Sequence, residues 1–252
     1  MKKICIISDL HGNLPNIQEC DILCICGDIV PSNIQYDMDK SIYFLQHDFK
    51  DWIDTLNVKH CILTWGNHDF IGEYLYNSNV NPSKYLFGEN SNIHILIDKS
   101  IELYGIKFYG TPWCPDLKQW AFYGPSSFLR TMFNKIPKDT DILLTHCPPK
   151  VGQQGIILEL YNDFLTNFGC EELKVAIDNI FGNKKDKTYI FSGHVHSGNH
   201  DYEIENNCIY RNVSILDERY NLKYYPLHID YKVSVYKKIK FFIKKVVNFL
   251  KF

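Results

Sequence analysis

The sequence has no Cys-x-x-Cys pair, no apolar run long enough to cross a bilayer, and almost no net charge. Its nine cysteines are an odd number, and several stand in apolar, strand-like runs: Cys5, Cys24, Cys26 and Cys61. We therefore predict buried free thiols in a reducing compartment rather than disulfides or a zinc knuckle. A bilayer-spanning helix needs about 20 consecutive apolar residues, so none is expected.

Met1-Lys2-Lys3 leads directly into a short apolar segment, so we expect no signal peptide and a cytoplasmic protein. The formal net charge of −2 argues neither for nor against a nucleic-acid partner, and no clear nucleic-acid-binding signal is present. The 252 residues have an ordinary composition and show no internal repeat or linker, which predicts one large domain over residues 1–231.

Apolar segments alternate with a helical segment in the first part of the chain. Residues 3–8, 21–26 and 60–64 predict buried strands, and residues 41–56 have helical spacing with Ser41 as the N-cap. This alternation predicts a largely parallel sheet. In such sheets the functional site lies beyond the carboxyl ends of the strands.

The rest of the chain is less regular. Residues 77–92 predict a loop-rich connection, followed by a meander of short strands at 92–97, 100–103 and 106–110. Further strands are expected at 141–145, 188–191, 201–204, 208–213 and 226–229, and helices at 126–133 and 170–181.

Polar side chains of the kinds that bind metals follow five of the predicted strands. They include five of the ten histidines: Asp9, His11, Asp28, Asn67, His68, Asp69, His146, His194 and His196. Each one alone could be an ordinary turn or surface residue. The repeated order of strand, loop and ligand makes that explanation poor for the whole set, which therefore predicts a shared site at one edge of the sheet.

These segments resemble the motifs of the calcineurin-like metallophosphoesterases. They occur in the order of that family as Asp9-x-His11, Gly27-Asp28, Gly66-Asn67-His68-Asp69, Thr145-His146 and Gly193-His194-Val195-His196. The resemblance covers residues 9–196 and implies an α/β fold. The implied architecture is a four-layer sandwich of two mixed β-sheets flanked by helices, with a dinuclear metal centre.

The resemblance also implies how two divalent ions would be held. One would be bound by Asp9, His11, Asp28 and His196, and the other by Asp28, Asn67, His146 and His194. Asp28 would then bridge both ions. Mixed imidazole, carboxylate and amide ligands suit Mn, Fe, Zn, Co or Ni better than Ca. Two such ions lower the pKa of a bridging water, and the hydroxide formed would attack a phosphoester.

His68 is not needed as a ligand, and the resemblance makes it the catalytic residue that protonates the leaving oxygen or stabilises its charge. Asp69 could orient His68 or could serve only as a surface or capping residue. Asn67 and His68 are expected to contact the substrate. Trp113 could line the substrate pocket or simply cap the core.

Details of the motifs favour one branch of the family. The arginine of the phosphoprotein phosphatase motif is absent after Gly27-Asp28, and the lipid A pathway pyrophosphatases have arginine where His68 stands. A closer resemblance is to the small metallophosphoesterase-domain proteins related to the brain-expressed 239 type, through Gly110-Thr111-Pro112-Trp113, residues 140–149 and Asn212-Val213-Ser214. It implies a phosphodiesterase acting on a small phosphodiester such as a cyclic nucleotide.

Three alternatives remain beside the phosphodiesterase. The same site could serve a phosphomonoesterase or a nuclease, or the chain could be a non-catalytic metal-binding scaffold. A degenerate scaffold should lack His68 or several ligands, whereas this sequence keeps them all.

Residues 232–252 form a second feature, which we predict to be a basic amphipathic helix. Apolar residues recur at helical spacing on one face, lysines lie on the other, and no acidic residue follows Asp230. Such a helix could dock on its own domain, lie on an anionic membrane surface, or contact a protein partner or nucleic acid. Membrane contact would make the protein peripheral at a membrane.

Overall fold

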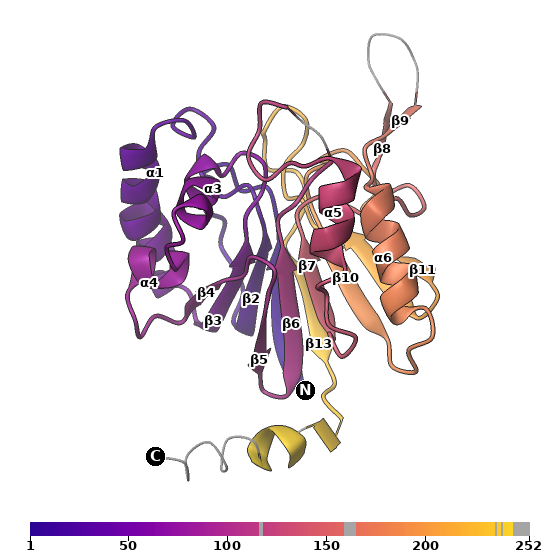
Figure 1. Ribbon diagram of the computed structural model, residues 1–252. Coiled ribbons are helices and arrows are strands. Elements are labelled where there is room, and N and C mark those ends of the chain that lie inside the picture. Colours follow the sequence, from indigo (N-terminus) through magenta and orange to yellow (C-terminus); the bar gives the residue numbers. More distant parts are fainter. Residues whose placement is uncertain (116–117, 159–164, 235, 238, 244–252) are drawn as a thin grey trace.

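The structure is a computed structural model and describes all residues except 116–117, 159–164, 235, 238 and 244–252. Two large β-sheets pack face to face, and helices cover both outer surfaces (Figure 1). The four-layer α/β sandwich expected from the motifs is therefore confirmed.

The first sheet has the strand order β13-β1-β2-β3-β4. Four strands are parallel: β1 (Lys2–Ile7), β2 (Cys20–Cys26), β3 (Val58–Thr64) and β4 (Ile93–Ile95). β13 (Leu227–Tyr231) runs antiparallel beside β1. Because the parallel strands all end at the same edge, the loops that follow them are brought together.

The second sheet has the order β11-β12-β10-β7-β6-β5. Its central strands are parallel: β12 (Cys208–Asn212), β10 (Thr188–Ser192), β7 (Ile142–Thr145) and β6 (Ile106–Thr111). The edge strands β11 (Glu203–Glu205) and β5 (Lys99–Leu103) are antiparallel to their neighbours. A separate hairpin pairs β8 (Ile156–Leu158) with β9 (Leu165–Asn167).

In the expected meander over residues 92–110, the pairing of the last two strands is confirmed, but the place of the first strand is wrong. β4 pairs with β3 in the first sheet, whereas β5 and β6 form a hairpin in the second. The chain therefore changes sheets after β4. Short apolar strands of this kind carry no local signal of the sheet they will join.

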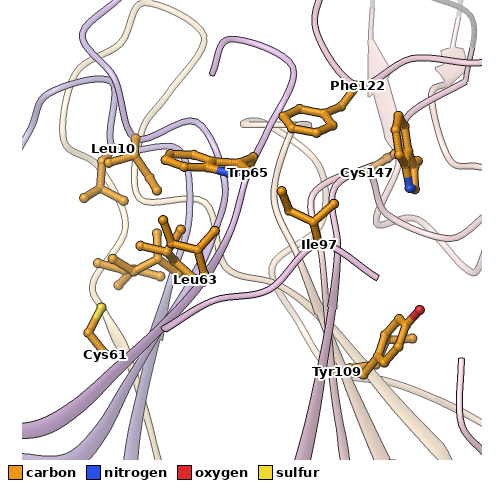
Figure 2. Close-up of a cluster of buried hydrophobic side chains, with 14 of the residues drawn as sticks. Leu10, Cys61, Leu63, Trp65, Ile97, Tyr109, Phe122 and Cys147 are labelled. Atoms are coloured by element: carbon orange, nitrogen blue, oxygen red, sulfur yellow. The ribbon is translucent and has the colours of Figure 1, made fainter. Parts of the chain in front are cut away.

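Strand residues alternate between two cores. Ile4 and Ile6 face the opposite sheet, while Cys5 and Ile7 face the helices. Burial on both faces explains why these strands are continuous apolar runs. All nine cysteines are buried and free, as predicted. Figure 2 shows part of the larger core, with Leu63 and Trp65 at the end of β3.

Helices on one side of the sandwich cover the first sheet (Figure 1). They are α1 (Met38–Phe44), a π-helical turn (Leu45–Phe49), α2 (Lys50–Thr55), α3 (Phe70–Asn77) and α4 (Pro82–Phe87). On the other side, α5 (Ser126–Phe133) and α6 (Glu171–Phe181) cover the second sheet.

Two local predictions on the first side are corrected. α1 is capped by Asp37, whose Oδ1 accepts a hydrogen bond from the backbone N of Lys40 at 3.1 Å, so Ser41 is not the N-cap. The segment predicted as a loop over residues 77–92 contains α4. Its signals were Asn81 at the N-cap and Pro82 in the first turn, a combination typical of helix starts.

After β13 the chain continues beneath the amino ends of the parallel strands (Figure 1). Residues 236–237 and 239–243 are helical, and the remainder of the predicted tail helix lies outside the described residues. Across the described part of the chain, no helix combines the length and apolar character needed to cross a membrane.

Candidate metal centre

The loops after the parallel strands of both sheets bring the predicted metal ligands together. β1 is followed by Asp9 and His11, β2 by Asp28 and β3 by Asn67, while β7 is followed by His146 and β10 by His194 and His196. Six of the seven side chains belong to buried residues, and His194 is partly buried. The structure therefore unites residues that lie nearly 200 positions apart in the sequence.

Asp28 occupies the centre of this cluster. Its Oδ2 lies 3.5 Å from Nε2 of His11 and 3.2 Å from Nε2 of His146. Its Oδ1 accepts a hydrogen bond from the backbone N of His68 at 2.8 Å. Since His11 and His146 belong to the two predicted ligand sets, one carboxylate oxygen faces both sets, as a bridging ligand must.

The first set is oriented by neighbouring oxygen atoms. Nε2 of His196 lies 3.3 Å from Oδ1 of Asp9, while its Nδ1 donates to the carbonyl oxygen of Asp217 at 3.0 Å. Nδ1 of His11 lies 3.1 Å from Oγ of Ser32, and its Nε2 is buried without a hydrogen-bond partner. One potential ligand atom from each of Asp9, His11 and His196 lies within 4.8 Å of the others. A divalent cation would satisfy these atoms, and the outer partners fix the rings for it.

The second set converges on Asn67. Its Oδ1 lies 2.9 Å from Nε2 of His146 and 2.9 Å from Nδ1 of His194. Nδ1 of His146 donates to the carbonyl oxygen of Cys26 at 2.8 Å, which directs Nε2 into the site. An amide oxygen and two imidazole nitrogens therefore surround one point, a donor set that fits a borderline divalent ion.

The histidines of the site divide into two classes by pKa. Burial opposes protonation of His146 and His196, but the carboxylates of Asp28 and Asp9 outweigh it and raise the pKa values to about 10 and about 9. Burial lowers the pKa values of His11 and His194 to about 4. Because a ligand nitrogen must be deprotonated to bind a metal, cations would compete with protons at His146 and His196.

Several of the predicted ligands have a strained backbone, as do other described residues outside the site. Four of the predicted ligands have left-handed backbone conformations: Asp9 (φ 58°), His11 (43°), Asp28 (54°) and His194 (68°). Such angles are uncommon outside glycine and cluster at functional sites. The adjacent glycines are fixed by packing, because a Cβ on Gly193 would lie 2.2 Å from Oδ2 of Asp9, and one on Gly66 would lie 2.2 Å from Oδ1 of Asp28.

The sequence was also compared with models of known protein families. The sequence model of the calcineurin-like phosphoesterases matches residues 2–198. The chain belongs to this family.

Relatives support the same assignment. A metallophosphoesterase domain-containing protein 1 from Homo sapiens is 26% identical over 243 residues, which cover 89% of this chain and 69% of that protein. A UPF0046 protein from Caenorhabditis elegans is 34% identical over 160 residues, which cover 62% of this chain and 37% of that protein. The resemblance to the small metallophosphoesterase-domain proteins is therefore confirmed.

Other similar proteins are more distant in length or sequence. A probable rhamnogalacturonate lyase C from Emericella nidulans is 28% identical over 200 residues, which cover 78% of this chain but only 17% of that protein. Among solved structures, a dimetal phosphatase from Danio rerio matches 84% of this chain and 86% of its own, with 10% identity and a TM-score of 0.45.

His68, the residue that the family motif makes catalytic, lies beside the predicted ligands. Its Nε2 is 4.0 Å from Oδ2 of Asp28, and its Nδ1 lies 2.7 Å from Oε1 of the buried Gln35. The centroid of the Trp120 ring lies 4.2 Å from that of the His68 imidazole. The sequence interpretation missed Gln35 and Trp120, because both stand in irregular loops outside the family motifs.

Asp69 does not orient His68. Its carboxylate accepts hydrogen bonds from the backbone N atoms of Ile29, Val30 and Gly66 at 2.9, 3.0 and 2.8 Å. The last residue of the Gly-Asn-His-Asp motif therefore ties the loop after β2 to the loop after β3. Asp69 is fully buried and its side chain makes no capping hydrogen bond to α3, so the surface and capping roles considered for it are corrected as well.

Trp113 lies in the core rather than at the site, and the substrate-binding role considered for it is corrected. Only 4% of its surface is exposed, and its Nε1 donates to Oδ2 of Asp98 at 2.7 Å. The ring packs in edge contacts against Phe122 and Phe128. The Gly-x-Pro-Trp segment shared with the family branch is thus a packing feature here.

A cavity of about 180 Å³ opens at the cluster and is lined by Asp28, Asn67, His68, His194, His196, Glu218 and Tyr220. Tyr220 comes from the loop between β12 and β13, and its ring lies 4.7 Å from that of His11. Among the described residues that line the cavity, none is lysine or arginine. Tyr220 and Glu218 were also missed from the sequence, because they follow the last family motif.

Proposed function

We propose that the protein is a metal-dependent phosphodiesterase that hydrolyses a small phosphodiester such as a cyclic nucleotide. The observation that carries this proposal is that Oδ2 of Asp28 faces both ligand sets. It lies 3.5 Å from Nε2 of His11 and 3.2 Å from Nε2 of His146. Two divalent cations at the two ligand sets would activate a water and neutralise the phosphoester charge. Manganese is the first ion to test, since the donor set suits several borderline metals.

His68 is positioned for proton transfer to a leaving oxygen. Its Nδ1–H donates to Gln35, so that Nε2 remains available at the cavity. In its imidazolium form His68 also carries a proton on Nε2, which it can give to the leaving oxygen as a general acid, becoming the neutral Nδ1–H tautomer. Asn67 lines the same cavity and would contact the bound phosphoester.

The charge of the cavity favours a diester over a monoester. The described lining contains no cationic lysine or arginine, and Glu218 adds a carboxylate at the rim. A phosphomonoester carries roughly −1.5 to −2 charges near pH 7, whereas a diester carries a single negative charge. The second charge of a monoester would therefore have no dedicated partner among these side chains.

The size of the cavity and its aromatic neighbours support a nucleotide substrate. A volume of about 180 Å³ holds a phosphoryl group and leaves the rest of the substrate outside. Trp120 beside His68 and the half-exposed Tyr220 beside His11 offer rings against which a base could stack. The nine free thiols agree with a reducing, cytoplasmic setting for this activity.

A metal-supplemented activity screen tests the proposal. With Mn, Fe, Zn, Co or Ni added, we expect faster turnover of bis-p-nitrophenyl phosphate than of p-nitrophenyl phosphate, and turnover of 2′,3′- or 3′,5′-cyclic nucleotides. Asp28→Ala should be inactive under every condition. Undiminished turnover in that variant, or no turnover of any phosphoester, would contradict the enzyme assignment. A preference for the monoester would contradict the diesterase assignment alone.

A further inference from the structure

The segment after β13 lies at the end of the sandwich opposite the metal centre. Val233 is buried with the residues between the two sheets, which anchors the start of the segment to the domain. The helical residues that follow lie beneath the amino ends of the parallel strands (Figure 1). The predicted metal ligands follow the carboxyl ends of the same strands.

One side of this helical segment contacts the domain. Nζ of Lys237 pairs with Oδ1 of the buried Asp141. A Cβ on Gly105 would lie 3.1 Å from the carbonyl oxygen of Lys237 and 3.5 Å from Cβ of Phe241. Lys237 and Phe241 are four residues apart and therefore share one helical face. That face is directed toward the turn between β5 and β6.

The apolar side of the segment is exposed. We call Tyr236, Ile239, Phe242 and Ile243 the apolar tail face, and their exposed fractions are 73, 54, 68 and 55%. Spacings of three and four residues place them together. If the segment docked on its own domain through its apolar side, these residues would be covered. The described structure therefore contradicts self-docking through this face.

The charged residues of the tail segment itself have one sign in the sequence. No acidic residue follows Asp230, whereas lysines continue along the chain: Lys232, Lys237, Lys238, Lys240, Lys244, Lys245 and Lys251. Exposed lysines also stand at the amino ends of β1 and β10, at Lys3, Lys185 and Lys187, beside the exposed carboxylates of Asp186 and Asp230. Exposed apolar side chains flanked by lysines match the boundary between acyl chains and anionic headgroups.

We propose that this end of the molecule binds an anionic lipid bilayer. The apolar tail face enters the interfacial region, and the surrounding lysines contact the headgroups. A protein partner or a second copy of the chain would bury the apolar residues equally well, but neither accounts for a lysine-only segment. Binding in this orientation directs the cavity at Asp28 away from the bilayer and toward soluble substrate.

Co-sedimentation with vesicles tests the proposal on the full chain. We expect the protein to sediment with phosphatidylcholine vesicles that contain phosphatidylserine, but not with phosphatidylcholine alone, and salt should weaken binding. Ile239→Ser combined with Phe242→Ser should reduce binding about tenfold or more because two interfacial side chains are lost. Lys240→Gln should reduce it roughly fivefold.

A matched control replaces two exposed apolar residues elsewhere, Ile204→Ser combined with Leu165→Ser, and should bind vesicles like the unmodified chain. Phosphodiester turnover without vesicles should be unchanged in all these variants, which separates this test from that of the proposed function. Equal binding to neutral vesicles, or full binding by the Ile239/Phe242 variant, would overturn the proposal. A dimer in size-exclusion chromatography that the same variant dissociates would overturn it in favour of a second copy.

Discussion

Nδ1 of His68 lies 2.7 Å from Oε1 of Gln35, and Gln35 is almost completely buried. The contact joins residues 33 positions apart and orients the imidazole through a neutral amide rather than a carboxylate. The carboxylate closest in sequence, Asp69, is occupied by three backbone N–H groups. Gln35 is therefore a positioning residue that acts through His68.

Replacing Gln35 should lower turnover without removing metals. Gln35→Met keeps the length of the side chain but removes the acceptor, so the imidazole loses its orientation and kcat should fall about tenfold to a hundredfold. Gln35→Glu retains an acceptor at the same place and should recover most of the rate. Steady-state kinetics with bis-p-nitrophenyl phosphate, together with metal analysis, distinguish this role from a structural one. A change confined to KM would contradict it.

His68 itself should be needed for chemistry but not for metal binding. His68→Gln should lower kcat by about a hundredfold to ten-thousandfold, the usual range for a lost general acid or base. Metal content, measured by plasma mass spectrometry, should match that of the unmodified protein. Loss of metals in this variant would mean that His68 is a ligand.

Asp28→Ala should remove both metals, because the carboxylate faces both ligand sets. Its loss also leaves the backbone N of His68 without the acceptor that it has at 2.8 Å. Metal analysis after dialysis should show less than one ion per chain, with activity at background. The matched control Asp51→Ala removes an exposed carboxylate from α2 and should leave metal content unchanged. Retention of one full equivalent in Asp28→Ala would contradict the bridging position.

The sequence interpretation succeeded where function depends on short motifs at strand ends. Asp9, Asp28 and His146 each follow a buried strand, and parallel strands deliver their ends to one edge of a sheet. It failed where the partner of a residue is distant and unpatterned. Nothing local indicates that Gln35 contacts His68, or that Tyr220 reaches the cavity from a loop beyond the last motif.

The same distinction applies to the fold. Most strands were predicted from their apolar runs, but the β8–β9 hairpin was missed. The pairing of β4 with β3 rather than with β5 depends on contacts distant in sequence. For the Ser41 cap, the local signal existed and was misread. Asp37 stands closer to the first helical residue, Met38, and its side chain satisfies the N–H of Lys40.

Trp113 should matter for stability rather than for substrate binding. Trp113→Phe removes the indole N–H that donates a hydrogen bond to Oδ2 of Asp98 at 2.7 Å. The Asp98 carboxylate then keeps the side-chain hydrogen bond from Thr111. The free energy of unfolding should fall by about 1–3 kcal/mol, measured by urea denaturation, with KM unchanged. Trp120→Phe, which alters a ring beside His68, should raise KM and leave the free energy of unfolding unchanged. A raised KM in Trp113→Phe at unchanged stability would restore the pocket role.

His196 offers the sharpest test of the two-metal arrangement. Its Nε2 faces Asp9 at 3.3 Å, whereas the neighbouring His194 faces Asn67 through Nδ1 at 2.9 Å. His196→Gln should therefore release one metal and leave the other, lowering the content from two ions per chain to one. His47→Gln, on an exposed histidine of the π-helical turn, is the control and should keep both. Loss of both ions, or of neither, would contradict the assignment of His194 to one metal and His196 to the other.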